Sequence, residues 1–160
     1  MKKRPRTSEG MTVLTPGSLK QTNSGKRLYT IPELLGITGI TRKQVAYWAQ
    51  IKLLNPVMRA TASRAGSPTS FYSPEEVVKA MIISDLKRAG FSLRQIHQVA
   101  RNLETNGIRL DNNENYLLTD GYSVYFAYND NEVVDILKHH RQMLLLVPVH
   151  EQVEKLKRAA

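Results

Sequence analysis

Cysteine is absent from this 160-residue sequence, which excludes disulfide bonds, thiolate metal sites and cysteine nucleophiles. The absence also fits a reducing compartment. No apolar run approaches the length that spans a membrane, and the N-terminus lacks the apolar core of a signal peptide. We therefore expect a cytoplasmic protein without a membrane partner.

Motifs of catalysis and of cofactor binding are missing as well. The sequence has no glycine-rich phosphate loop, no zinc-ligand spacing and no nucleophile motif. His139 and His140 are neighbours, so on a helix they would point about 100° apart and could not both face one metal ion. His150 is close to them in sequence, but an exposed surface histidine is the commoner explanation. We expect no cofactor, no metal site and no enzymatic activity.

Charge is unevenly spread along the chain, whose formal net charge is +9. Residues 1–27 carry seven basic and one acidic residue, net +6, and residues 28–103 carry ten basic and four acidic residues, again net +6. Residues 104–160 carry six basic and nine acidic residues, net −3. This distribution indicates that the front two thirds contact a polyanion while the last part faces something else.

Residues 1–26 differ from the rest of the chain in composition. They begin "MKKRPR" and continue with Ser, Thr, Gly and Asn, broken only by a short apolar island at residues 11–14. Such a segment cannot bury enough apolar surface to fold, and we predict a disordered basic arm over 1–26. A solvated tail with no specific role explains the same composition equally well.

Four helix starts follow within residues 27–103. Each combines a Ser or Thr cap with Glu or Gln three positions later, namely Thr30 with Glu33, Thr41 with Gln44, Ser73 with Glu76 and Ser92 with Gln95. Each also has apolar residues placed for a hydrophobic staple, namely Tyr29 with Leu34, Ile40 with Val45, Tyr72 with Val77 and Phe91 with Ile96. Four repetitions of both signals define the helix boundaries.

Apolar periodicity predicts the core of these helices. The first two contribute Ile31, Leu34, Leu35, Ile37, Ile40, Val45, Leu53 and Leu54. The last two contribute Val77, Val78, Met81, Ile82, Leu86, Phe91, Leu93, Ile96, Val99 and Leu103. Trp48 is expected to pack into the same core, and Gly90 is expected to end the third helix as a left-handed cap.

The segment "NPVMRATASRAGSPTSFYSPEE" separates the second helix from the third. Pro56 stops the second helix one or two residues before it, and Pro74 occupies the first position of the third. Between them the sequence predicts a basic β-hairpin with short strands near residues 57–60 and 70–72. Two helices followed by such a hairpin, or wing, and then by two more helices follow the winged helix-turn-helix plan.

The pattern changes after the fourth helix, where "ETNGIRLDNNENY" is too rich in Asn, Asp and Gly to continue it. The runs "YLLT" and "YSVYFAY" then flank an Asp-Gly pair, which is a strong hairpin signal. Asp130 or Asn131 is expected to cap a helix that runs to about His140. A buried strand in "MLLLVPVH" and a terminal helix in "EQVEKLKRA" are expected to follow. Residues 104–160 therefore predict a small α+β module in the order β-β-α-β-α, and the whole chain is mainly α.

Two long stretches carry a family resemblance. "YTIPELLGITGITRKQVAYWAQIKLLNP" has an aromatic-x-Ile-x-Glu-Leu start, a Thr-Gly turn, two adjacent aromatics and a closing Lys-Leu-Leu-x-Pro. "FYSPEEVVKAMIISDLKRAGFSLRQIHQVARNL" has a Tyr-Ser start of the third helix and a Gly-Phe-Ser-Leu-x-x-Ile junction. On these motifs Tyr29 to Leu103 resembles the MerR family of bacterial transcription regulators. Ala46 and Ser70 depart from the family, which commonly has arginine at both places, and the wing is longer than usual.

The resemblance implies a sequence-specific, double-stranded DNA-binding transcription regulator in the bacterial nucleoid. It implies a homodimer on a palindromic promoter, which either distorts an over-long spacer for RNA polymerase or blocks the polymerase. Classical members pair through a long helix that this chain lacks. We therefore expect the module at 104–160 to serve dimerisation or sensing, with the dimer contact between about residue 106 and residue 160, and residues 27–103 to fold alone as a monomer.

Candidate DNA contacts follow from the start of the second helix. In a helix-turn-helix the first turn of this helix enters the major groove, so Arg42 and Lys43, which fit the helix dipole poorly, would contact phosphates or guanine edges. Tyr47 resembles the family aromatic whose hydroxyl approaches the DNA backbone. A Lys-Arg pair on a helix is otherwise usually a solvated face. The predicted DNA-binding residues are Thr41, Arg42, Lys43, Gln44, Tyr47, Arg59, Arg64 and Tyr72.

Two other functions remain open. An architectural or excision-type DNA binder would use the same domain without promoter control. The module at 104–160 also shows a weak resemblance to sequences of unknown function that are attached to such domains and related to antitoxin-like proteins. An antitoxin-like autoregulator would bind an unknown partner protein through this acidic module.

Overall fold

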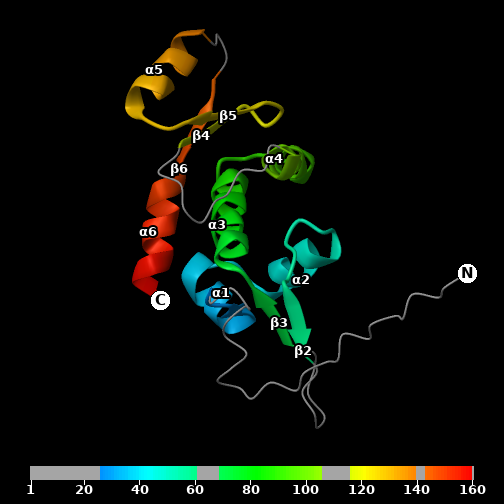
Figure 1. Ribbon diagram of the computed structural model, residues 1–160. Helices are drawn as coiled ribbons and strands as arrows, with labels where there is room; N and C mark the ends of the chain where they lie inside the picture. The colour runs from blue at the N-terminus through cyan, green and yellow to red at the C-terminus, as the bar shows by residue number, and fades with distance from the viewer. Residues whose placement is uncertain (1–25, 61–68, 106–115, 140–142, 160) are drawn as a thin grey trace, which may run out of the picture.

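The computed structural model describes residues 26–60, 69–105, 116–139 and 143–159 (Figure 1). The predicted basic arm except for its last residue, Arg64 in the wing, and His140 lie outside the described residues. The elements are, in order, β1 (Tyr29–Thr30), α1 (Ile31–Thr38), α2 (Arg42–Gln50), β2 (Met58–Ala60), β3 (Thr69–Tyr72), α3 (Pro74–Arg88), α4 (Leu93–Thr105), β4 (Tyr116–Thr119), β5 (Val124–Ala127), α5 (Asp130–His139), β6 (Leu145–Pro148) and α6 (Val149–Ala159). This order confirms the predicted mainly helical fold with a β-β-α-β-α segment after the fourth helix.

Capping explains where the first helices begin. Thr41 Oγ1 accepts a hydrogen bond from Gln44 N (3.1 Å), and Gln44 Oε1 accepts one from Thr41 N (2.9 Å), so the predicted capping box of α2 is complete. The boxes of α1 and α4 are complete as well. At α3 only half of the box forms, because the Glu76 carboxylate accepts from Asn55 N (2.8 Å) while Ser73 Oγ accepts from Glu76 N. The start of α3 is therefore tied to the turn that follows α2.

α2 is shorter than predicted, and the chain leaves it through a tight turn. The helix ends at Gln50, several residues before Pro56. Lys52 adopts a left-handed conformation with φ of 59°, which a right-handed helix cannot continue. Leu53 N then donates to Trp48 O (2.8 Å), which folds the turn back onto the helix. No sequence pattern predicts that a lysine will adopt a left-handed conformation. The prediction therefore relied on Pro56 and placed the end of α2 too late.

The predicted wing is present and belongs to a three-stranded sheet of order β1-β3-β2. β2 pairs antiparallel with β3, with Arg59 opposite Ser70. On its other edge β3 pairs with β1, with Tyr29 opposite Tyr72. The sequence did not predict β1, because two residues are too few to show an alternating pattern. The added strand fixes the base of the wing to the helical core.

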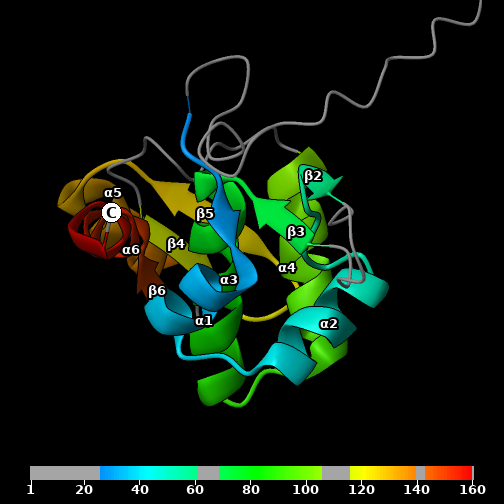
Figure 2. The same ribbon diagram turned by 90° about the horizontal axis from the view of Figure 1, so that it is seen from below.

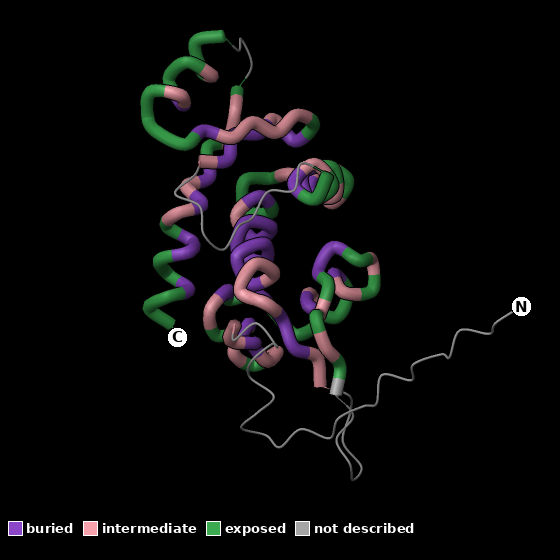
Figure 3. Tube along the Cα trace, in the orientation of Figure 1, coloured by how far each residue is buried: buried purple, intermediate pink, exposed green. Residues whose placement is uncertain are grey.

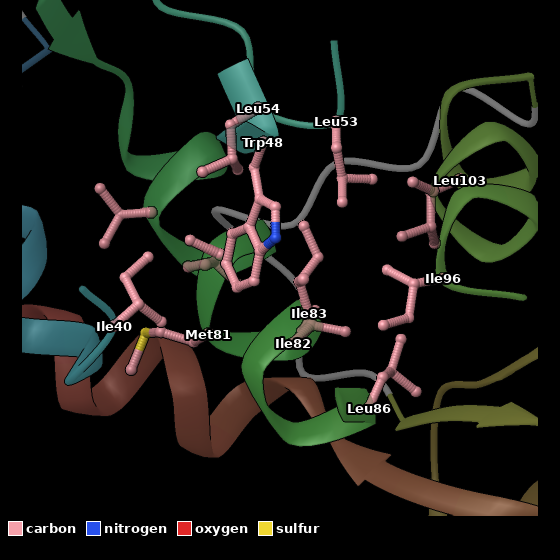
Figure 4. Packing of buried hydrophobic residues seen from close by; sticks show 14 of the residues in the cluster. Ile40, Trp48, Leu53, Leu54, Met81, Ile82, Ile83, Leu86, Ile96 and Leu103 are labelled. Atoms are coloured by element: carbon pink, nitrogen blue, oxygen red, sulfur yellow. The ribbon is translucent and has the colours of Figure 1, made fainter. Parts of the chain in front are cut away.

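α3 is the centre of the fold, with nine of its fifteen residues buried (Figure 3). Side chains of α2 and of α4 point toward it, among them Trp48 from α2 and Ile96 from α4 (Figure 4). Trp48 is 1% exposed, as predicted for a core residue. Every apolar residue predicted for the core of the first four helices is either buried in one cluster or packed against it. Gly90 follows α3 with φ of 93°, which confirms the predicted left-handed cap.

One charged side chain lies inside this core. Lys79 of α3 is 5% exposed, and a buried ammonium requires partners. Its Nζ lies 2.7 Å from Glu76 Oε1 and 3.6 Å from Glu104 Oε1. Because Glu76 also holds Asn55 N, this cluster joins the turn after α2, the start of α3 and the end of α4.

The second part of the chain contains a three-stranded antiparallel sheet of order β5-β4-β6. The predicted hairpin is present, but its loop holds the four residues 120–123 rather than the Asp-Gly pair alone. The cap of α5 is Asn129, whose Oδ1 accepts from Glu132 N (3.0 Å), and not residue 130 or 131 as predicted. α6 begins at Val149, two residues earlier than the sequence suggested. None of the described helices is long and apolar enough to cross a membrane.

The two parts share one hydrophobic core. Val149, Val153 and Leu156 of α6 are buried in the same cluster as the residues of α3. Figures 1 and 2 agree that α6 lies on one side of α3, whereas α2 and the β2–β3 wing lie on the other. α6 of the module therefore packs on the side of α3 that faces away from α2.

Candidate nucleic-acid interface

The N-terminal half of α2 carries exposed cations, while buried side chains on another face of the helix hold it in the core. Val45 and Trp48 anchor the helix in the core, and the side chains of Arg42 and Lys43 are exposed. The first turn of α2 contains no acidic residue. Among the described residues no carboxylate forms an ion pair with either cation. The positive end of the helix dipole and two side-chain cations therefore face the same region of solvent, which favours a polyanionic ligand.

Thr41 and Gln44 have a structural role in addition to their predicted one. Their reciprocal hydrogen bonds close the first turn of α2 and so orient Arg42 and Lys43. Thr41 is exposed and Gln44 partly exposed. The side chains that could contact DNA are thus carried by a helix start at which two backbone donors, Thr41 N and Gln44 N, are already satisfied.

Tyr47 and Tyr72 were both predicted to contact DNA, and their environments differ. Tyr47 is 47% exposed on α2, one turn after Lys43. Tyr72 is 1% exposed and packs in the core, and burial is the main reason that its pKa is raised. A side chain enclosed in this way cannot reach a DNA ligand, so we correct that prediction and assign Tyr72 to the core. Its staple position against Val77 had already suggested a packing role.

The wing supplies one described cation. Arg59 is exposed on β2, on the same side of α3 as α2 (Figures 1 and 2). Arg64 lies in the segment 61–68, outside the described residues. Of the predicted set, the structure therefore brings the α2 residues and Arg59 to one side of the molecule.

A hollow of about 280 Å³ lies between α2 and the corner where α3 meets α4. Its lining residues are Thr41, Lys43, Gln44, Tyr47, Trp48, Lys87, Phe91, Leu93 and Ile96. Lys87 Nζ lies 6.0 Å from the centre of the Trp48 ring, close enough for a cation–π contact. Lys87 and its exposed neighbour Arg88 were not among the predicted DNA-binding residues. Both stand in the last turn of α3, where cations suit the helix dipole and give no signal of function.

The predicted absence of a metal site concerned His139, His140 and His150. Among the described residues no three His, Cys, Asp or Glu side chains gather in a way that could hold a metal ion. His139 Nδ1 lies 2.7 Å from Asp135 O within its own helix. His150 makes an edge-to-face contact with Tyr116 at a centroid distance of 5.1 Å. His139, which is exposed, is therefore bonded within its own helix, and His150 packs against Tyr116.

The arrangement defines a class of protein. An exposed second helix with a basic first turn, a two-stranded wing after it and two supporting helices form a winged helix-turn-helix domain, whose second helix enters the DNA major groove. Residues 29–103 match the family described as MerR HTH family regulatory protein. This part of the chain therefore belongs to the MerR family.

Similar proteins are found in mycobacteria. The chain is 34% identical over 110 residues to an uncharacterized HTH-type transcriptional regulator of Mycobacterium bovis, and the match covers 69% of this chain and 48% of that protein. An uncharacterized HTH-type transcriptional regulator of Mycobacterium tuberculosis matches with the same identity and coverage. The chain thus spans about half the length of the curated relatives it matches.

Proposed function

We propose that this protein is a transcription regulator that binds double-stranded DNA sequence-specifically at promoters, in the bacterial nucleoid. The observation that carries the proposal is the pair Arg42 and Lys43, exposed in the first turn of α2 with no carboxylate partner among the described residues. A helix start with this charge is stabilised when DNA phosphates or guanine edges complete its environment. The MerR-family match over residues 29–103 and the names of the mycobacterial relatives support the same function.

The test removes the two cations together. Replacing Arg42→Ala and Lys43→Ala should weaken duplex binding roughly tenfold or more at moderate salt. It should also reduce the slope of log affinity against log salt by about 1.8, since each lost phosphate contact removes about 0.9. Folding should be unchanged, because both side chains are exposed. Fluorescence anisotropy with a labelled duplex selected from genomic DNA measures both quantities.

A matched control removes the same charge elsewhere. Lys157 and Arg158 are exposed in the last turn of α6, on the opposite side of α3 from α2. The double variant Lys157→Ala with Arg158→Ala lowers the net charge equally but should keep the salt slope. Equal affinity of the parent protein and the α2 variant would show that α2 is not the reading helix.

We also propose that the protein acts as a homodimer on a palindromic site. Two reading helices related by a two-fold axis would then contact half-sites one DNA turn or a multiple apart. α5 exposes Val134 and Leu137, each 46% exposed and one helical turn apart, and such a face suits pairing with a second copy better than exposure to water.

Light scattering distinguishes the assembly states. The full chain should have twice the 18.1 kDa mass of one copy. The variant Val134→Asp with Leu137→Asp should have the mass of one copy and lose affinity for a two-half-site duplex while it keeps affinity for a single half-site. A parent protein of single-copy mass at every concentration would contradict the dimer.

A further inference from the structure

The tip of the β4–β5 hairpin, residues 120–123, packs directly on the corner between α3 and α4. A methyl group added at Gly121 would lie 2.7 Å from Phe91 Cε1 and 2.7 Å from Gln95 Nε2, closer than any side chain could stand. Asn102 Nδ2 of α4 also donates to Tyr122 O (3.4 Å). The hairpin backbone can approach the Phe91 ring this closely only because residue 121 is glycine.

The tip is held rigid by its own side chains. Thr119, which is fully buried, donates from Oγ1 to Ser123 O (2.7 Å) and accepts from Gly121 N (2.9 Å). Asp120 Oδ1 accepts from Tyr122 N (2.8 Å) and from Ser123 N (2.7 Å). Four hydrogen bonds between side chains and backbone over five residues fix the loop, so it transmits a displacement to its neighbours instead of absorbing it.

Of the residues under the tip, Phe91 faces α2 on its other side. Phe91 lines the hollow of about 280 Å³ together with Trp48 and Lys43 of α2. Gln95 is the capping-box residue of α4, and its Oε1 accepts from Ser92 N (2.9 Å). The contact therefore lies between the C-terminal module and the helix that we propose to read DNA.

We propose that the β4–β5 tip positions Phe91 and, through Phe91, the α2 helix. Gly121 is then a positioning residue for DNA binding by α2. The module then has two roles: α6 packs against α3, and the β4–β5 tip sets the width of the hollow beside α2. The part of this inference that concerns DNA rests on the proposed function, whereas the part that concerns the position of α2 does not.

The experiment adds one methyl group at the contact between Gly121 and Phe91. Gly121→Ala pushes the Phe91 ring away from the tip, and the hollow gives the ring room to move toward Trp48. Trp48 is the only tryptophan of the chain, so its fluorescence reports the change at α2 directly. We expect a shifted Trp48 emission and a duplex affinity weaker by roughly 3- to 30-fold, the range that residues coupled to a distant site produce.

Gly90→Ala is the matched control. Gly90 has φ of 93°, close to the 91° of Gly121, so alanine causes similar backbone strain at both positions. Apart from its chain neighbours Ala89 and Phe91, no described residue has an atom within 4 Å of a methyl group added at Gly90. This variant should lower the melting temperature but leave the Trp48 emission and the duplex affinity close to those of the parent protein.

A second pair of variants covers the case in which Gly121→Ala fails to fold. The added methyl would strike Phe91 Cε1, Phe91 Cδ1 and Gln95 Nε2. Phe91→Leu removes Cε1 and the rigid ring, so the double variant Gly121→Ala with Phe91→Leu has more room for the methyl. The double variant should recover emission and affinity toward the values of Phe91→Leu alone. This non-additivity is the signature of a direct contact.

The outcomes separate this inference from the proposed function. If Gly121→Ala and Gly90→Ala change emission and affinity equally, or the double variant recovers nothing, the tip does not position α2. If no variant and no parent protein binds duplex DNA, but Trp48 emission still shifts in Gly121→Ala alone, the positioning is supported and the proposed function fails. If duplex binding persists with Trp48 unmoved in Gly121→Ala, the proposed function survives and the positioning is wrong.

Discussion

Gln152 of α6 donates a hydrogen bond from its side-chain amide to Oδ2 of Asp85 in α3, joining residues 67 positions apart in the sequence. Gln152 is 5% exposed and lies beside the buried Val149 and Val153. A polar contact inside an apolar interface fixes the register of two helices, because sliding would leave a buried amide without its partner. The C-terminal module is therefore docked on the first domain in one specific orientation.

The burial of Asp85 gives the stability a pH dependence that can be measured. Burial is the main cause that raises the pKa of Asp85 above its ordinary value of 3.8, and the charges of Arg88 and Lys155 oppose it. The folded state then binds the Asp85 proton more tightly than the unfolded state does. The stabilisation from protonation is complete below the unfolded pKa and is lost as the pH rises through the folded pKa.

Asp85→Asn should remove the loss of stability that Asp85 causes as the pH rises. The asparagine carbonyl can still accept a hydrogen bond from Gln152, and it carries no charge. Melting temperatures of the parent protein and the variant between pH 3 and pH 8 measure it, and the difference in favour of the variant should grow as the pH rises from about 4. Other groups titrate equally in both proteins. Parallel curves over the whole range would contradict the raised pKa.

Docking of α6 also changes what is expected of the isolated first domain. The sequence suggested that residues 27–103 fold alone, yet Leu156 is 5% exposed within the core that contains α3. Leu156→Ala should reduce the free energy of unfolding by about 2–5 kcal/mol, as for other buried leucines, and truncation after Leu103 should lower the melting temperature further. Chemical denaturation measures the first change. Arg158→Ala, at an exposed position of the same helix, should stay within about 0.5 kcal/mol of the parent protein.

Local features of the fold could be read from the sequence because their causes are local. The capping box of Thr41 with Gln44 and the left-handed Gly90 each depend on residues a few positions apart. The spacing of apolar residues likewise identified the core of the first four helices. Such signals need no knowledge of the rest of the chain.

Features that depend on tertiary context were missed for the opposite reason. Glu76 has the spacing of a capping box, but its carboxylate binds Lys79 and Asn55 N instead. No sequence pattern predicts the close contact between Gly121 and the Phe91 ring, because these residues lie 30 positions apart in the sequence. For the candidate site, the sequence predicted α2 as the DNA-contacting helix, which stays a prediction, and it included Tyr72, which the structure buries in the core. Lys87 was not among the predicted residues, because a lysine near the end of a helix gives no signal of function.

Phenylalanine variants of Tyr47 and Tyr72 distinguish a tyrosine that contacts DNA from one that packs in the core. Tyr47 is 47% exposed on α2 and Tyr72 is 1% exposed in the core, and replacing either by phenylalanine removes only a hydroxyl group. If Tyr47 donates a hydrogen bond to a DNA phosphate, Tyr47→Phe should weaken duplex affinity by roughly 3- to 10-fold, the usual value of one such bond, with no change in melting temperature. Tyr72→Phe should shift the melting temperature and leave the affinity unchanged. Anisotropy titrations and thermal melts on both variants decide the assignment, and a Tyr72→Phe variant that melts like the parent protein but binds duplex DNA more weakly would restore Tyr72 to the interface.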